Sequence, residues 1–103
     1  MTVSSSLGSN LDATAADEIS IYPNPFSATT TIRLNFAKDE QQVKVDVVSM
    51  EGRIISTLYE GDVTAGLPYN LTFDGSPFKS GIYMVRVISG QTVQIRKIDL
   101  LKN

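Results

Sequence analysis

The chain has 103 residues, of which 42% are hydrophobic and 19% are charged, a composition typical of one soluble globular domain with its own core. Nine basic and eleven acidic side chains give a formal net charge of −2, which provides no basic field for a nucleic-acid backbone. Cysteine, histidine and tryptophan are absent, so the sequence excludes disulfides, thiolate metal sites and histidine-dependent catalysis. No apolar run reaches the roughly 20 residues of a membrane span, and the N-terminus lacks a signal-peptide pattern.

Residues 1–18 differ in composition from the rest of the chain. They are rich in Ser, Ala, Thr, Gly and Asn and show no sustained period of a helix or a strand. We predict a flexible linker over residues 1–18 and one folded domain over residues 19–103. Because the chain starts at Met1 with no export signal, we expect it to be a piece excised from a longer protein.

From residue 19 onward, short runs of β-branched and aromatic residues alternate with turn residues, and no helical period is found. The clearest run is Thr29–Phe36, in which Ile32, Leu34 and Phe36 share one face. Seven strands are predicted in all, at Ile19–Tyr22, Thr29–Phe36, Val43–Val48, Arg53–Tyr59, Tyr69–Phe73, Ile82–Ile88 and Thr92–Leu101. Short one-sided strands at this spacing favour an all-β antiparallel sandwich of two sheets.

The connections between the predicted strands have turn chemistry of their own. Pro23 and Pro25 end the first strand, because proline fixes φ and donates no hydrogen bond. Residues 38–42 are polar and predict a connection outside any strand. Glu51-Gly52 predicts a tight hairpin turn with a positive φ at Gly52, and Gly61, Gly66 and Pro68 predict a loop.

Five segments, taken in order, resemble the landmarks of the type IX (Por) secretion system C-terminal sorting domain family. They are Tyr22-Pro23-Asn24-Pro25, Asp46–Arg53, Ala65-Gly66, Ser80–Val87 and Arg96–Lys102. The resemblance covers Ile19–Lys102. It implies an immunoglobulin-like sandwich of about seven strands that serves as a sorting signal for a passenger protein N-terminal to it. It also implies a type IX translocon as partner, transit through the periplasm to the cell surface or medium, and removal by a sortase-like peptidase.

Seven residues near the C-terminus are the candidates for recognition by the translocon: Gly81, Tyr83, Arg96, Lys97, Leu100, Leu101 and Lys102. A structural interpretation is open for each of them. Gly81 also fits a bend into a central strand, and the basic residues, with Lys79 and Arg86, also fit solvated strand faces or a protected sheet edge. Leu100-Leu101-Lys102 fits either strand addition to a partner or closure of the core by Leu100.

A structural role is predicted for the remaining landmark positions, which are Tyr22, Pro23, Asn24, Pro25, Gly52 and Gly66. Tyr22-Pro23-Asn24-Pro25 predicts a rigid exit from the first strand. Gly52 and Gly66 are interpreted as positions whose backbone angles a side chain would oppose.

No catalytic, cofactor or metal site is predicted. Asp62, Asp74 and Asp99 lack the spacing of a calcium loop, and the serines have no activating base. Asp46 and Glu51 are the remaining pair for acid–base chemistry, and we expect both to be exposed to solvent.

An accessory module for carbohydrate binding or adhesion is the alternative to a sorting signal. Such modules usually present a surface platform of aromatic side chains. Here tryptophan is absent, and Phe36, Phe73 and Tyr83 fall on or beside faces assigned to the core.

Overall fold

The computed structural model describes residues 17–90 and 92–102. These residues form seven strands and no helix, which confirms the predicted all-β fold. The strands are β1 (Glu18–Tyr22), β2 (Thr29–Asn35), β3 (Glu40–Ser49), β4 (Ile54–Val63), β5 (Pro68–Asp74), β6 (Gly81–Ser89) and β7 (Thr92–Leu100). Most of the predicted linker, residues 1–16, lies outside the described residues.

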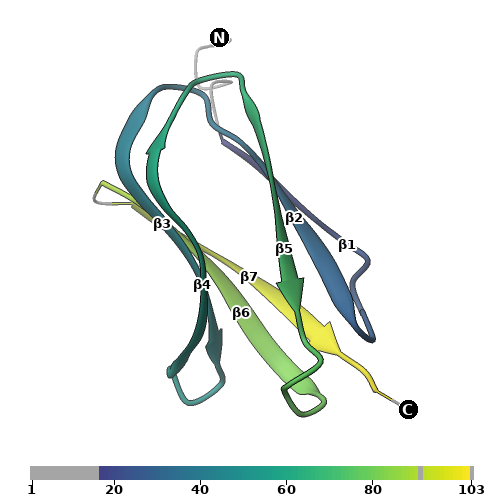
Figure 1. The fold of residues 1–103 in the computed structure, drawn as a ribbon. Coiled ribbons are helices and arrows are strands. Elements are labelled where there is room, and N and C mark those ends of the chain that lie inside the picture. The colour runs from purple at the N-terminus through teal and green to yellow at the C-terminus, as the bar shows by residue number, and fades with distance from the viewer. Residues whose placement is uncertain (1–16, 91, 103) are drawn as a thin grey trace, which may run out of the picture.

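The strands form two sheets that pack face to face (Figure 1). One sheet has the order β1-β2-β5 and the other has the order β4-β3-β6-β7. Every pairing within the sheets is antiparallel. The arrangement is therefore the two-layer sandwich that the strand spacing predicted, and it is consistent with an immunoglobulin-like fold.

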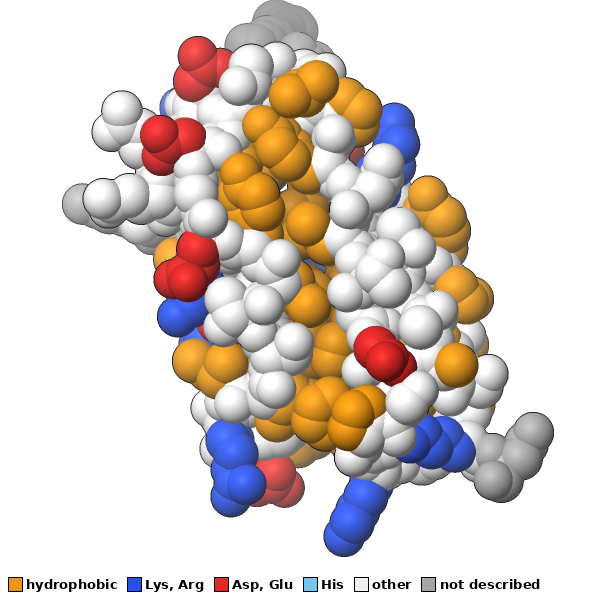
Figure 2. All heavy atoms as spheres, viewed as in Figure 1, with side chains coloured by type: hydrophobic (Ala, Val, Ile, Leu, Met, Phe, Trp, Pro, Cys, Tyr) orange, Lys and Arg blue, Asp and Glu red, His pale blue; other side chains and the backbone are white. Residues whose placement is uncertain are grey.

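The core lies between the sheets and is built from alternate residues of the central strands. Ile32 and Leu34 of β2 are at most 2% exposed, and they face Val45 and Val47 of β3, which are fully buried. The largest buried side chains come from Phe36 and Phe73. β4 and β5 are edge strands of different sheets and do not pair with each other. Figure 2 shows further apolar side chains along the line between them.

The β3–β4 hairpin is longer than the sequence predicts at both strands' outer ends. Glu40 pairs with Val63 and Val43 pairs with Gly61, so the polar connection predicted at residues 38–42 is wrong in part, as is the loop predicted from Gly61. The Gln42 N–H donates to the Asp62 carboxylate over 3.0 Å, which continues the hairpin across an irregular register. The polar composition here reflects solvent exposure and not the end of a strand.

Asp46 and Arg86 form a partly buried ion pair on the face of the four-stranded sheet that points away from the core. Asp46 lies between the inward-facing Val45 and Val47, yet it is fully buried, so the prediction that it is exposed is wrong. Arg86 of β6 lies directly across from it, with Nε and Nη2 each donating to a carboxylate oxygen over 2.8 Å. The hydrogen bonds that Arg86 donates to the Asp46 carboxylate raise the pKa of Arg86 above its ordinary value.

Removing one partner of this ion pair is expected to lower the free energy of unfolding by more than removing both partners does. Arg86→Met strands the Asp46 carboxylate in a buried position, and we expect a loss of about 3 kcal/mol in the free energy of unfolding. Combining Asp46→Val with Arg86→Met removes both charges and should bring stability back to within about 1 kcal/mol of the parent chain. Urea unfolding measures both values, with Arg53→Met at an exposed position as the control. Equal stability of Arg86→Met and Arg53→Met would contradict the assignment.

Candidate recognition site at the C-terminal strand

The strand β7 brings together most of the residues predicted for recognition. It lies at the edge of the four-stranded sheet, beside β6. Their antiparallel pairing places Gly81 across from Leu100 and Tyr83 across from Ile98. Arg96 and Lys97 precede this region on the same strand. The candidates from β6 and from the C-terminus therefore form one continuous region of the sheet.

The segment Tyr22-Pro23-Asn24-Pro25 leaves β1 and crosses to the outer edge of β7. The Asn24 side chain makes two hydrogen bonds there: Nδ2 donates to the Lys97 carbonyl over 3.1 Å, and Oδ1 accepts from the Asp99 N–H over 3.0 Å. An amide side chain has both a donor and an acceptor, as a peptide group does. Asn24 thus takes the place of a neighbouring strand along part of β7.

Phe26 continues this attachment through its backbone. Its N–H donates to the Asp99 carbonyl over 3.0 Å, and its carbonyl accepts from the Leu101 N–H over 2.8 Å, which makes a parallel bridge between Phe26 and Leu100. Both side chains are buried, at 3% and 0% exposure, and the Phe26 ring packs edge-on against Phe73. The chain between β1 and β2 therefore belongs to both sheets.

Thr30 holds the start of this crossing in position. Its side chain is fully buried, and its Oγ1 donates to the Pro23 carbonyl over 2.7 Å. Since a buried hydroxyl without a partner is costly, this bond ties the crossing to β2.

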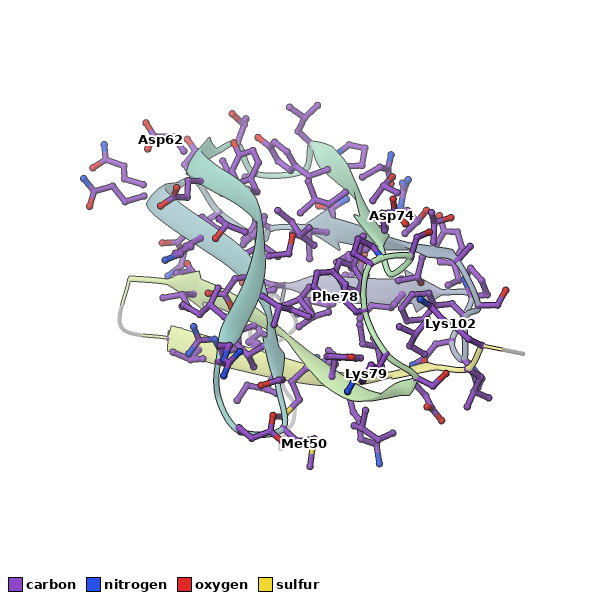
Figure 3. The ribbon with its side chains drawn as sticks, turned by 60° about the horizontal axis from the view of Figure 1, so that its bottom comes forward. Met50, Asp62, Asp74, Phe78, Lys79 and Lys102 are labelled. Carbon is purple, nitrogen blue, oxygen red and sulfur yellow. The ribbon has the colours of Figure 1, made fainter. Side chains whose placement is uncertain are left out.

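The residues after β7 are attached to the connection between β5 and β6. The Lys102 N–H donates to Ser80 Oγ over 2.9 Å, and Lys102 Nζ donates to the Ser76 carbonyl over 2.6 Å. Lys102 lies on the same side of the molecule as Asp74 (Figure 3). The C-terminal end is thus held by Phe26 on one side and by this connection on the other.

The pKa of the Asp74 carboxylate is lowered by its neighbours Ser76 and Lys102. Hydrogen bonds from the side chain and the backbone N–H of Ser76 hold the pKa of Asp74 below its ordinary value, and the charge of Lys102 adds to the effect. Because the pKa is lower in the folded state, the stabilisation is present above the ordinary aspartate pKa and is lost as the pH falls through the lowered value. The carboxylate is fully exposed to solvent, which screens the effect.

Burial separates the recognition candidates into two groups. Leu100 is fully buried, as expected for closure of the core, whereas Leu101 is 53% exposed. Arg96, Lys97 and Lys102 are exposed, while Gly81 and Tyr83 are half-buried. The Tyr83 hydroxyl donates to the Lys79 carbonyl over 2.6 Å. A partner at the intact surface can therefore touch the charged residues and Leu101, but it cannot touch Leu100.

The basic residues of the last quarter of the chain do not share one face. Arg86 is paired with Asp46 on the outer face of the sheet. Arg96 follows the alternation of Ile98 and Leu100, so it lies on the opposite face of β7 from Lys97. The guanidinium of Arg96 turns back to donate to the Ile95 carbonyl over 3.1 Å.

The two glycines of the structural landmarks lie in turns. Gly52 has a φ of 87° in the β3–β4 turn, where its N–H donates to the Ser49 carbonyl over 2.9 Å. Gly66 has a φ of 75°, and its N–H donates to the Phe36 carbonyl over 3.0 Å. Both angles disfavour a residue with a side chain.

The described residues present little chemistry for catalysis. No group of three or more acidic side chains within residues 17–90 and 92–102 is placed to hold a metal ion, and Asp62 and Asp74 lie far apart in Figure 3. A hollow of about 520 Å³ beside the β3–β4 turn is lined by one carboxylate, Glu51, together with Arg53, Lys79 and Tyr83 among others.

Among residues 17–90 and 92–102, no helix is long and apolar enough to cross a membrane.

Sequence reasoning missed the attachment of Asn24 to β7. The two prolines correctly indicated the end of β1, but Asn24 was interpreted only as part of a rigid exit. The available signal was an amide side chain between two residues that lack a backbone donor. Its partners lie more than 70 positions further along the chain, and no local pattern identifies them.

Comparison with models of known protein families gives a match over most of the chain. The profile of the family described as the secretion system C-terminal sorting domain matches residues 20–100. The match includes the proline segment, the β3–β4 turn and the whole of β6 and β7 up to Leu100. No curated protein matches the chain.

Asn24→Ala is expected to loosen the outer edge of β7. It removes two hydrogen bonds of about 1 kcal/mol each, so we expect a loss of about 2 kcal/mol in the free energy of unfolding and faster hydrogen exchange at the Asp99 amide. Asn24→Asp keeps the acceptor for Asp99 but loses the donor to Lys97. Its free energy of unfolding should lie between those of the parent chain and Asn24→Ala. Asn70→Ala, which removes an exposed contact with Arg33, is the control. An unchanged exchange rate at Asp99 in Asn24→Ala would show that the amide does not hold the strand.

Proposed function

The chain belongs to the family of secretion system C-terminal sorting domains, and we propose that its folded sandwich is the feature by which the type IX translocon recognises the protein that carries it. The family assigns the chain to type IX secretion and implies export to the cell surface or release. Recognition of the folded state is the step that goes beyond the family.

The observation that carries this proposal is the extent of the match. Residues 20–100 begin inside β1 and end at the last residue of β7, so the family is defined over the whole sandwich and not over a short terminal peptide. The landmark at Asn24 and the landmark at β7 are in direct contact. A signal read from the folded domain depends on both.

The proposed route has three stages. A larger passenger reaches the periplasm with this domain as its tail, the translocon binds the domain, and the passenger crosses the outer membrane. A sortase-like peptidase then removes the tail, for which the linker over residues 1–18 is the proposed region of cleavage. The domain itself is non-catalytic in this scheme, which is in keeping with its family.

The alternative of a carbohydrate-binding or adhesive module gains no support from the aromatic residues. Phe26, Phe36 and Phe73 are buried. The remaining aromatic side chains, apart from Tyr22, are half-buried and pack against the core. Tyr22 alone is more than half exposed among the described aromatic residues, and one ring does not form a platform.

A secretion assay tests the proposal. The full chain is fused behind a fluorescent passenger with a periplasmic export signal and expressed in a bacterium with a type IX system. We expect surface delivery of this fusion. Removal of Ile98–Asn103 deletes the buried side chains of Ile98 and Leu100, so it should unfold the domain and abolish delivery.

A shorter truncation separates the fold from the terminal residues. Removal of Leu101–Asn103 leaves the core intact and should preserve delivery if the sandwich is what the translocon recognises. Resistance of each fusion to limited proteolysis reports whether the domain is folded. A folded, intact fusion that stays in the periplasm would overturn the proposed function.

A further inference from the structure

The outer edge of β7 consists of two halves that differ in their hydrogen bonding. In the second half, outward-pointing groups of Lys97, Asp99 and Leu101 are bonded to Asn24 and Phe26. In an antiparallel strand, the backbone groups of successive residues point to alternate sides. The N–H and C=O groups of Val93 and Ile95 therefore point outward as well. In the described part of the chain, no strand lies against them. The Ile95 carbonyl accepts a hydrogen bond from the guanidinium of Arg96, the next residue, over 3.1 Å, and an incoming strand would replace that bond.

The open half of β7 lacks the features by which sheet edges usually avoid pairing. Its ladder with β6 runs without a register shift from Gly81–Leu100 to Ser89–Thr92, and residues 92–95 include neither proline nor a charged side chain. The charged Arg96 stands at the end of the open half. The other edges are protected: β4 has three register shifts, β5 begins with Pro68, and β1 has five residues and is followed by Pro23. A regular, unprotected edge is a template for another strand.

The side chains beside this open edge are apolar and exposed. Val93 is 53% exposed and Ile95 is 51% exposed. Both lie on the outer face of the sheet, where they pair across β6 with Ile88 and Arg86. Strand addition uses backbone groups that no strand pairs with for affinity, and neighbouring side chains for specificity. This edge provides both.

The charges at one end of the open edge indicate the composition of a strand that fits it. Arg96 and Lys97 follow Ile95 directly, and neither has a carboxylate within 4 Å among the described residues. Because the two side chains lie on opposite faces of β7, an acidic side chain directly across from Arg96 would meet Arg96 and not Lys97. Alternate apolar side chains would cover Val93 and Ile95.

We propose that residues 92–96 of β7 are a docking edge for an extended segment of a protein partner, which pairs antiparallel to β7 and carries an acidic residue followed by alternating apolar residues. Antiparallel pairing places the N-terminal end of that segment beside Arg96 and Lys97. The edge continues the line that Asn24 and Phe26 already occupy. The inference deepens the proposed function and rests on it, because the export machinery would supply the segment.

An end-blocked peptide, Asp-Val-Thr-Val-Thr-Val, is the probe for this edge. Hydrogen exchange of the full chain is followed by NMR with and without the peptide. The Val93 and Ile95 amides should exchange at least about tenfold more slowly when the peptide is present. The Gln94 amide, which points toward β6, should be unaffected. A peptide with Lys in place of Asp should protect the two amides less.

Two variants test the backbone and the side chains separately. Ile95→Pro removes an outward donor that has no partner in the sheet, and it should abolish the protection at Val93. Val93→Lys keeps every backbone donor but adds a charge at the edge, and it should weaken peptide binding by about tenfold or more. Leu67→Lys, at an apolar residue that is 51% exposed and lies in the connection between β4 and β5, is the matched control and should bind as the parent chain does.

The amide exchange rates at the edge decide whether the peptide binds there. Protection of the edge that is lost in Val93→Lys but kept in Leu67→Lys supports the docking edge. No protection in the parent chain would falsify it, and protection that rises with protein concentration without peptide would replace the partner by a second copy of the chain. In the secretion assay, delivery lost only in Val93→Lys assigns the edge to export. Failure of the parent fusion rejects the sorting function and leaves the peptide result standing.

Discussion

The last strand of the sandwich is paired on both sides near its C-terminal end, although it lies at the edge of its sheet. On one side it pairs with β6, and on the other it is bonded to Asn24 and Phe26. The two sheets depend on this contact, because the chain between β1 and β2 leaves one sheet and joins the other there. Without it, a free terminal strand would be expected to fray. With it, the first and last landmarks of the family form one structural unit.

This attachment also decides which part of the domain is open to partners. The buried position of Leu100 removes its side chain from the surface, while the two bonds of Asn24 occupy the backbone beside Lys97 and Asp99. The outward backbone groups that no neighbouring segment pairs with lie in the first half of β7. The sequence indicated a free C-terminal end as the interaction surface, whereas in the structure that end is bonded to Asn24 and Phe26 and the start of β7 is accessible.

The outer face of the four-stranded sheet shows how a polar pair can be part of a stable β-sandwich. Asp46 is the fully buried acidic residue at the centre of this face, and the bidentate contact with Arg86 offsets its desolvation. Arg86 is one of five basic residues near the C-terminus for which the sequence left open a solvated strand face or a protected sheet edge. Its charge is instead neutralised by a carboxylate that lies 40 positions earlier in the chain.

The sequence by itself determined the strands, because alternation of apolar side chains and turn residues at Gly52 and Gly66 are local properties. The same pattern determined that Ile32, Leu34 and Phe36 share one face, which is buried, and the ordered landmarks indicated the family that the profile match confirms. The tertiary structure alone decided that Asn24 holds β7 and that Arg86 pairs with Asp46. It also decided that β3 begins at Glu40 and that β4 continues past Gly61 to Val63. These features arise between residues far apart in the chain, and a local pattern carries no information about which distant groups will meet.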